Sequence, residues 1–267
     1  MKVDLLIPTY RLQDPQALIA IRTMEWYTRS KGYDLHVPPV HSGGVIHWVR
    51  NEALAAIRKD TDYVLFCDDD MAPPRDAAVR LLRHNLPVCS ALTTTRSFPV
   101  RLTLKKYNPE TGLFYQAEDV VPDVVASGQY GAGAGFLLVA KYVIDDLRER
   151  WLNADDWVED NQLMLSRLHV RAELRDREKA RIAACRRERL AAGDVHPHYF
   201  EFFTAPDQHD FGEDMSFCRR ILLAGYDIGI DTGVHVSHMG TFPFGPSFVG
   251  IQRPEEVRQT PLEEVYA

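Results

Sequence analysis

An apolar segment that runs directly into three aspartates constrains this chain more than any other feature. The segment reads Tyr63-Val64-Leu65-Phe66-Cys67-Asp68-Asp69-Asp70. A short, continuous apolar run is typical of a strand that is buried on both faces of a parallel sheet. Ligand sites in open α/β sheets lie just beyond the carboxyl ends of such strands. The segment therefore predicts an α/β fold with an acidic site at the end of a central strand.

The three carboxylates indicate a bound cation. Neighbouring carboxylates repel one another, so they need a cation or hydrogen-bond donors to stay ionised together. Oxygen ligands of this kind favour Mg²⁺ or Mn²⁺ that also carries substrate phosphates. The alternative is that Asp70 only caps a helix opened by Pro73 and Pro74. One cap needs one aspartate, so we expect a metal and diphosphate site.

Strand and helix patterns alternate through the first part of the chain. The expected strands are residues 3–7, 33–37, 63–67 and 87–92. The expected helices are residues 45–59, residues 76–85 and a first helix that Asp14 and Pro15 begin and Gly32 ends. Short β segments follow over residues 98–126, then a glycine-rich stretch, a strand at 136–139 and a helix at 141–150. This alternation is typical of a doubly wound sheet.

A charged segment interrupts this pattern. Residues 166–189 contain nine Arg or Lys and four Asp or Glu, with no Pro or Gly, in a chain whose formal charge is −7. Strong helix formers dominate, so we expect a long charged helical insertion at about residues 157–193. It is either a solvated helix or an arm for a partner subunit, which would give an oligomer, or for an anionic acceptor. Residues 241–267 are expected to form a C-terminal tail.

Composition limits the remaining possibilities. The 267 residues are 45% hydrophobic and 26% charged, which suits a single α/β enzyme domain. The net negative charge gives no general attraction to nucleic acid or to anionic membranes. We expect no transmembrane segment, no signal peptide and, because the four cysteines show no C-x-x-C spacing, a reducing cytoplasmic location.

The last third of the chain carries a second acidic pair and two histidines. Glu213 and Asp214 are expected to open a helix that reaches Ala224. Two short strands at 226–231 and 234–237 should follow, with His235 and His238 near their ends. The alternative is structural, because acids at a helix N-terminus are stabilised by the free N–H groups and the dipole.

Five short motifs, taken in order, resemble a known family. They are Ile7-Pro8-Thr9-Tyr10, Arg50-Asn51, Phe66-Cys67-Asp68-Asp69-Asp70, Gly212-Glu213-Asp214 and His238-Met239-Gly240. They look like the motifs of nucleotide-sugar-dependent glycosyltransferases of GT-A fold, in particular family 2 and its bacterial and phage relatives. The resemblance covers residues 3–240 apart from the charged segment. It implies one GT-A domain over residues 1–240, Rossmann-like, with a mostly parallel central sheet and flanking helices.

The resemblance also implies roles for the matching residues. The nucleotide sugar would be bound by Pro8, Thr9, Tyr10, Arg11, Arg50, Asn51, Asp68 and Asp69. Mn²⁺ or Mg²⁺ would be held by Asp68, Asp70 and His238, the last matching better than His235. Asp214 would be the catalytic carboxylate, with Glu213 beside it. A UDP-sugar is the expected donor, although residues 40–44 lack the family's usual acidic motif and leave guanosine open.

The expected reaction is transfer of the sugar to an acceptor hydroxyl. The metal and Arg50 would neutralise the leaving diphosphate, and Asp214 would take the hydroxyl proton in an inverting transfer. A retaining outcome stays open. So do two other classes, a sugar nucleotidyltransferase and a non-catalytic nucleotide- or carbohydrate-binding module. The acceptor could be a saccharide, a lipid-linked saccharide, a protein, a metabolite or modified DNA.

Overall fold

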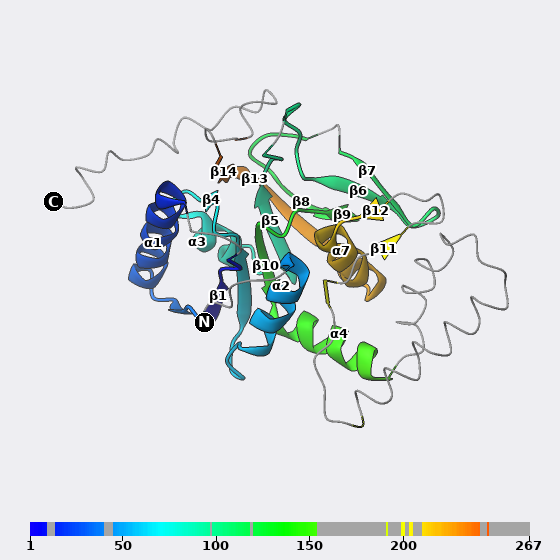
Figure 1. Cartoon of the computed structure of the whole chain (residues 1–267), viewed down its shortest axis with the longest axis horizontal. Helices are drawn as coiled ribbons and strands as arrows, with labels where there is room; N and C mark the ends of the chain where they lie inside the picture. Colours follow the sequence, from blue (N-terminus) through cyan, green and yellow to red (C-terminus); the bar gives the residue numbers. More distant parts are fainter. Residues whose placement is uncertain are drawn as a thin grey trace.

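The computed structural model of the protein describes residues 1–9, 14–39, 45–96, 98–117, 120–153, 191, 199–200, 203–204, 210–240 and 245. These residues build a mixed α/β fold around a seven-stranded sheet, shown in Figure 1. The expected insertion at 157–193, apart from residue 191, and the tail at 241–267, apart from residue 245, lie outside the described residues. Tyr10 and Arg11 do as well. No helix of the described part is long and apolar enough to cross a membrane.

The central sheet is mostly parallel, as expected. Its order is β2 (Asp34–His36), β1 (Lys2–Leu6), β3 (Tyr63–Cys67), β10 (Phe136–Ala140), β5 (Val88–Leu92), β13 (Ile228–His235) and β8 (Val125–Gly128). The pairings make β2, β1, β3, β5 and β13 point one way, while β10 and β8 are antiparallel to their neighbours. Four of these strands therefore end at the same side of the sheet as β3.

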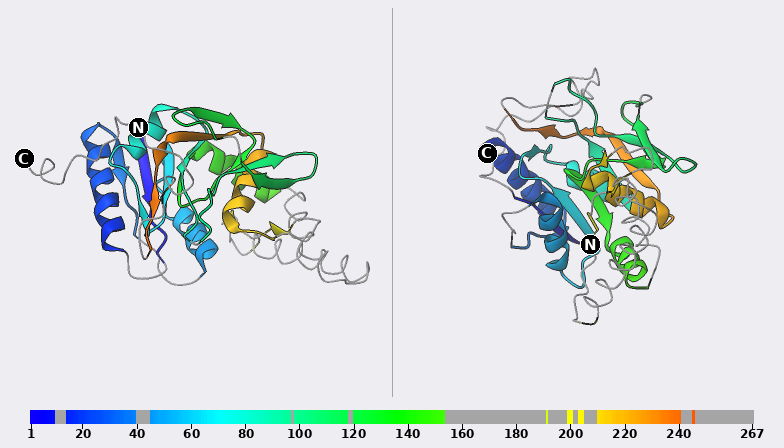
Figure 2. Two further views of the ribbon diagram at one scale, coloured as in Figure 1. Left: turned by 90° about the horizontal axis from the view of Figure 1, so that it is seen from above. Right: turned by 45° about the vertical axis from the view of Figure 1, so that its right-hand side comes forward.

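Helices cover both faces of the sheet, as Figure 2 shows. One face carries α1 (Pro15–Ser30) and α3 (Ala77–Arg83), and the other carries α2 (Ile46–Ala55), α4 (Lys141–Asn153) and α7 (Glu213–Leu223). The side chain of Asp14 accepts hydrogen bonds from the N–H groups of Gln16 and Ala17, which is the expected N-cap of α1. Gly225, at φ +91°, follows α7 in the left-handed conformation that favours glycine.

The core lies where β3 and β10 meet the helices. All five residues of β3 and of β10 are buried. Phe66 of β3 packs against Phe200 and Phe217, with ring centroids 5.3 Å and 6.2 Å away. Because Phe217 lies on α7, this aromatic contact holds the start of α7 near the end of β3.

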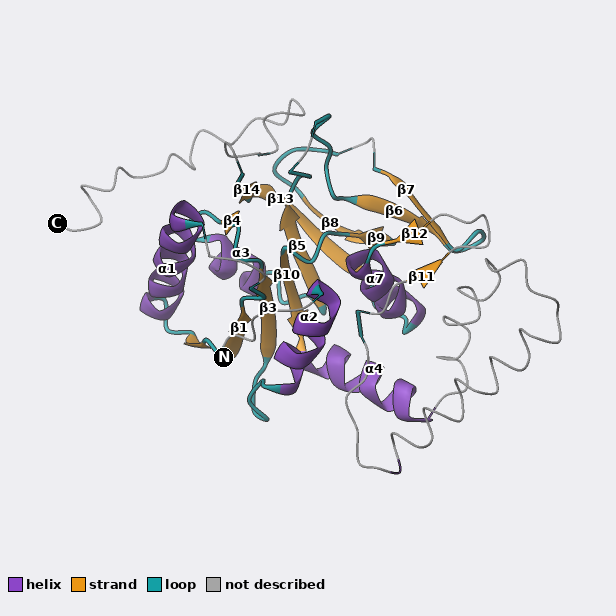
Figure 3. Ribbon diagram, in the orientation of Figure 1, coloured by secondary structure: helices purple, strands orange, loops and turns teal. Residues whose placement is uncertain are grey.

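Three small sheets stand beside the central one, as Figure 3 shows. They are β7 (Leu113–Gln116), β6 (Lys105–Asn108) and β9 (Tyr130–Gly131); β14 (Ser237–His238) with β4 (Met71–Ala72); and β11 (Phe203–Thr204) with β12 (Asp210–Phe211). The β4–β14 pair brings the chain just after the three aspartates next to the chain around His238.

Two expectations about the elements are wrong. The break expected between residues 231 and 234 is absent, because β13 runs from Ile228 to His235 with an irregular pairing after Asp231, and the next strand, β14, begins only at Ser237. A Cβ on Gly233, within this strand, would lie 2.6 Å from the Arg80 guanidinium, so the glycine makes room for that side chain. The second expectation, a helix over residues 45–59, is too long, because α2 ends at Ala55.

The helix-cap interpretation of Asp70 is also wrong. The residues directly after it, Met71 and Ala72, form strand β4, and α3 begins only at Ala77 after Asp76. The three aspartates therefore form the link between two strands rather than the start of a helix.

Candidate functional site

The three aspartates are positioned by backbone contacts at the end of β3. The N–H of Asp68 donates to the carbonyl of Gly135 at 3.0 Å, and the N–H of Met71 donates to the carbonyl of Asp68 at 3.1 Å. A Cβ on Gly135 would lie 2.3 Å from Met71 Cε and 3.4 Å from Asp68 Oδ2. The glycine therefore lets β10 run close beneath the acidic link.

A buried arginine joins the two acidic motifs. Arg50 of α2 is only 3% exposed. Its guanidinium donates to both carboxylate oxygens of Asp68 at 2.8 Å and to Glu213 Oε1 at 2.7 Å. The same group lies over the Phe200 ring, 5.5 Å from its centroid. Arg50 thus links residues 18 and 163 positions away in the sequence at one point.

The charge of Arg50 is secured by these partners. Burial works against the charge, but the carboxylates of Asp68 and Glu213 outweigh it, so the pKa of Arg50 is raised. The arginine stays protonated at any physiological pH, and it supplies the cation that neighbouring carboxylates need.

Asp214 is a carboxylate with an unusual affinity for protons. Burial and the neighbouring charge of Glu213 raise the pKa of Asp214 to about 6, although Arg50 and the N–H of Met215 oppose the change. That N–H donates to Asp214 Oδ1 at 2.7 Å. A carboxylate that titrates near neutral pH suits general acid–base chemistry. Asp214 also lies in the first turn of α7, where a carboxylate stabilises the N-terminus of a helix. The structural interpretation of this residue is therefore still an alternative.

A second charged cluster forms around Asp70. His238 Nε2 lies 3.1 Å from Asp70 Oδ2, and Arg96 makes an ion pair with the same oxygen. His238 Nδ1 lies 3.1 Å from the carbonyl of Thr94. Burial favours the neutral forms, but the hydrogen bond between the two groups prevails, so the pKa of Asp70 is lowered and the pKa of His238 is raised.

The two histidines differ in what they contact. His235 is buried, and its Nε2 lies 2.9 Å from the carbonyl of Thr232 in the same strand. His238 pairs across β14 and β4 with Met71, which is how it reaches Asp70. With Nδ1–H donating to Thr94, Nε2 is the nitrogen that faces Asp70, and it would become a metal ligand only on losing the proton that it donates to Asp70.

Of the three expected metal ligands, only Asp70 and His238 lie together. In the part of the chain that the structure describes, no three His, Cys, Asp or Glu side chains converge on one point. Asp70 and His238 form a pair, while Asp68 is turned to Arg50. Mg²⁺ and Mn²⁺ sites in phosphate-transferring proteins often use one or two protein ligands, with substrate oxygens and water completing the set. The roles of Asp68, Asp70 and His238 as metal ligands stay predictions.

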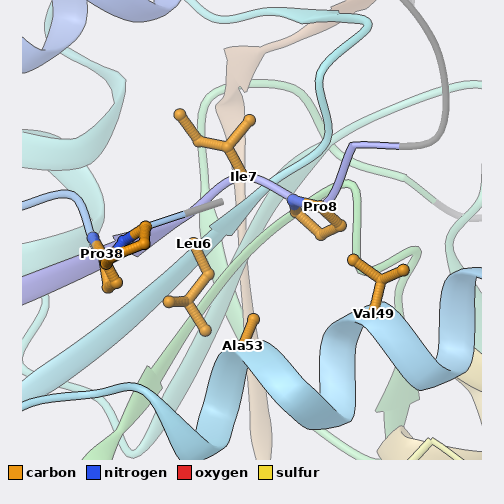
Figure 4. A pocket seen from close by; sticks show the side chains of 7 residues that line it. Leu6, Ile7, Pro8, Pro38, Val49 and Ala53 are labelled. Carbon is orange, nitrogen blue, oxygen red and sulfur yellow. The ribbon is translucent and has the colours of Figure 1, made fainter. Parts of the chain in front are cut away.

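An apolar pocket, shown in Figure 4, lies where β1 and β2 end. It is lined by Leu6, Ile7, Pro8, Pro38, Pro39, Val49 and Ala53 and opens onto about 210 Å³ of empty space. Its lining comes from the ends of β1 and β2 and from α2, the helix that also carries Arg50. Of the expected nucleotide-binding residues, Pro8 lines this pocket.

The other expected residues lie around these centres. Thr9 directly follows the pocket residue Pro8 in the sequence, and its hydroxyl lies 3.2 Å from the carbonyl oxygen of Ile7. Asn51 accepts a hydrogen bond from the N–H of Phe200 at 3.2 Å, which gives it a structural contact in the core. Asp69 is partly buried within the acidic link.

The sequence interpretation missed three features of the site. Phe200 lies under Arg50, and Arg96 pairs with Asp70. The sequence around Phe200 and Arg96 contains no local pattern that predicts either contact. The prolines at 38 and 39 line the pocket. They had a usable signal, since they directly follow an expected parallel strand, where ligands bind.

The bridge made by Arg50 leads to a prediction about stability. Replacing Arg50 with methionine should lower the free energy of unfolding by about 3–5 kcal/mol at neutral pH, because Asp68 and Glu213 would be left without their buried partner. Urea unfolding at neutral pH measures this loss.

The control is Arg22→Met on the exposed side of α1, where Arg22 pairs with Glu25. That change should cost less than about 1 kcal/mol. An Arg50→Met protein as stable as Arg22→Met would show that the bridge contributes nothing to the fold.

No protein-family model matches the chain, and no curated protein matches it. Among solved structures, it is similar to A197 from STIV, with a TM-score of 0.44, 12% identity, and coverage of 90% of this chain and 86% of that one. It is also similar to the catalytic domain of Drosophila beta1,4galactosyltransferase 7 in complex with xylobiose, with a TM-score of 0.34, 17% identity, and coverage of 55% and 52%. A further structure of that protein holds manganese, UDP-Gal and xylobiose.

A third similar structure is 4-diphosphocytidyl-2C-methyl-D-erythritolsynthase from Anaerococcus prevotii, with a TM-score of 0.34, 10% identity, and coverage of 58% of this chain and 75% of that one. The chain spans about half the length of the galactosyltransferase structure that it matches. At these identities the likeness concerns the fold alone, and at TM-scores below 0.5 it carries no conclusion about the reaction.

Proposed function

We propose that this chain is a glycosyltransferase that moves a sugar from a nucleoside diphosphate sugar to an acceptor hydroxyl. The observation that supports this most strongly is the meeting of the acidic end of β3 with the first turn of α7 through Arg50. Beside that junction lies a carboxylate, Asp214, whose pKa is about 6. A proton acceptor would thus lie next to an acidic cluster that would bind a diphosphate through a cation.

The apolar pocket would take the nucleobase. The pocket is small and open to solvent, so it would contact one face of a base rather than enclose the whole donor. Pro8 lines it, and Thr9, Tyr10 and Arg11 continue from it along the chain. The resemblance favours uridine as the base.

Asp70 and His238 would hold Mn²⁺ or Mg²⁺. When bound, the ion would neutralise the charge that develops on the departing diphosphate. Asp68 would complete the set, because an ionised carboxylate has about four lone-pair sites and the contacts to Arg50 do not use them all. Asp68 and Asp69 would also contact the ribose of the donor.

Asp214 would remove the proton from the acceptor hydroxyl. With a pKa of about 6 it is mostly ionised at neutral pH and still basic enough to accept a proton. Glu213, held by Arg50, would fix the first turn of α7 and so aim Asp214. Attack by the hydroxyl opposite the leaving diphosphate would invert the anomeric carbon.

Asp214→Asn tests this function. The change keeps the size of the side chain and an oxygen for the N–H of Met215, but it removes the base. Turnover in a sugar-transfer assay should fall by about 10²–10⁴-fold, while the dissociation constant of the nucleotide sugar should hardly change.

The control is Asp76→Asn before α3, which should transfer at the wild-type rate. Transfer by Asp214→Asn at the wild-type rate would remove Asp214 from the reaction. Binding without any turnover by the wild type would favour a binding module. Release of diphosphate from a nucleoside triphosphate and a sugar phosphate would favour a nucleotidyltransferase.

The raised pKa of Asp214 predicts that the stability of the folded chain depends on pH. The pKa of Asp214 is about 6 in the folded chain against the ordinary 3.8, so the folded state binds this proton more tightly than the unfolded state. Its stabilising effect is complete below the ordinary pKa and is lost as pH rises through about 6. Without added metal, Asp214→Asn should therefore melt above the wild type in mildly alkaline buffer, and the gap should close in acid.

Thermal melts of wild type, Asp214→Asn and Asp76→Asn, from acidic to mildly alkaline buffer, measure this difference in melting temperature. Asp76→Asn should show no such gain. A gap that stayed constant with pH, or an Asp214→Asn protein that melted below the wild type in alkaline buffer, would contradict the raised pKa.

A further inference from the structure

Asp70 has two cationic partners on a single oxygen atom. His238 Nε2 lies 3.1 Å from Asp70 Oδ2, and the guanidinium of Arg96 makes an ion pair with the same oxygen. A metal ion held by Asp70 and His238 together would need this oxygen, because it is the one that faces the imidazole. Arg96 and such an ion would therefore compete for Asp70 Oδ2.

The backbone just before Arg96 is tied to its neighbours. The N–H of Thr95 donates to the carbonyl of Arg101 at 2.8 Å, and the N–H of Arg101 donates to the hydroxyl oxygen of Thr95 at 3.1 Å. The carbonyl of Thr94 lies 3.1 Å from His238 Nδ1. These contacts hold the α-carbon of Arg96 close to His238, so its guanidinium can change partner without a change in the backbone.

Arg96 is held less firmly than the other arginine of the site, Arg50. The side chain of Arg96 is 50% exposed, whereas that of Arg50 is 4% exposed and lies between two carboxylates. An ion pair in contact with water contributes little to stability, but breaking a buried one leaves a charge without solvent or partner. Arg50 is therefore a fixed part of the site, and the contact of Arg96 with Asp70 is easily exchanged.

We propose that Arg96 covers Asp70 in the empty site and moves to the diphosphate of the donor when a divalent cation replaces it on Asp70. This inference rests on the proposed function, in which that cation carries the diphosphate. The phosphate oxygens would then be the nearest anionic partners for a guanidinium anchored beside His238. Guanidinium and phosphate groups form strong, often bidentate hydrogen bonds, and Arg96 stays protonated throughout the exchange.

This exchange predicts that the loss of Arg96 has opposite effects on two ligands. A divalent cation alone should bind more tightly, because it no longer has to displace a guanidinium from Asp70. A nucleoside diphosphate bound together with the cation should bind less tightly, because it loses a charged hydrogen-bond donor. A purely structural role of Arg96 would not change the two affinities in opposite directions.

Isothermal titration calorimetry of the full chain, first with Mn²⁺ and then with UDP in saturating Mn²⁺, tests the exchange. Arg96→Gln should bind Mn²⁺ alone about two- to fivefold more tightly, which matches the small contribution of an exposed ion pair. It should bind UDP in the presence of Mn²⁺ about tenfold more weakly. In EDTA the UDP affinities of the wild type and Arg96→Gln should not differ, because Arg96 then stays on Asp70.

The matched control is Arg101→Gln, which removes a charge from the residue that pairs with Thr95 and should bind Mn²⁺ and UDP like the wild type. Arg96→Lys keeps the charge but not the planar fork, so it should bind Mn²⁺ like the wild type and UDP more weakly. An unchanged Mn²⁺ affinity in Arg96→Gln, or a loss of UDP affinity that is as large in EDTA, overturns the exchange. Equal changes in Arg101→Gln would show a general effect of charge and would overturn it as well.

The outcomes separate the exchange from the function on which it rests. Tighter Mn²⁺ binding by Arg96→Gln, in a protein that binds neither UDP nor a nucleotide sugar, overturns the glycosyltransferase function and the diphosphate role of Arg96, while the competition for Asp70 stands. UDP binding and sugar transfer that are both unchanged in Arg96→Gln overturn the role of Arg96 and leave the proposed function intact.

Discussion

The contact on which the rest of the site depends is the buried guanidinium of Arg50 between Asp68 and Glu213. Desolvating a cation is costly, and it is tolerated here because two carboxylates surround it and the Phe200 ring lies beneath it. The pair of salt bridges connects α2, the end of β3 and the start of α7, three elements from distant parts of the chain. Without it, the acidic motifs would repel one another across the same space.

This arrangement divides the acidic residues into two electrostatic environments. Asp68 and Glu213 are neutralised by Arg50, and Asp70 is neutralised by His238 and Arg96. Asp214 receives less compensation, so burial and Glu213 raise its pKa to about 6. Carboxylates whose surroundings separate their pKa values in this way can take different parts in one reaction, as a metal ligand and as a base.

Much of the framework could be predicted from the sequence because its signals are local. The run from Tyr63 to Cys67 is apolar throughout and became the buried strand β3, and Asp14 caps α1 as expected. The direction of β10 carried no local signal, since a strand buried on both faces reads alike in either orientation. The break expected between residues 231 and 234 is absent from β13, and the space that Arg80 needs beside Gly233 cannot be seen in a one-dimensional pattern.

The same difference between local and long-range signals holds for the residues of the site. The acidic motifs were recognisable because their residues are consecutive, whereas the partner of Glu213 lies 163 positions away and is fixed only by the fold. The measurement that tests the account most directly is the melting temperature of the wild type, His238→Ala and His235→Ala with a panel of nucleotide sugars, each with and without Mn²⁺. A ligand that binds the folded state raises the melting temperature by mass action. The account predicts that a UDP-sugar raises it more when Mn²⁺ is present, in the wild type and in His235→Ala, and that only His238→Ala loses the dependence on Mn²⁺. A wild type whose melting temperature no nucleotide sugar raises, with or without Mn²⁺, would contradict it.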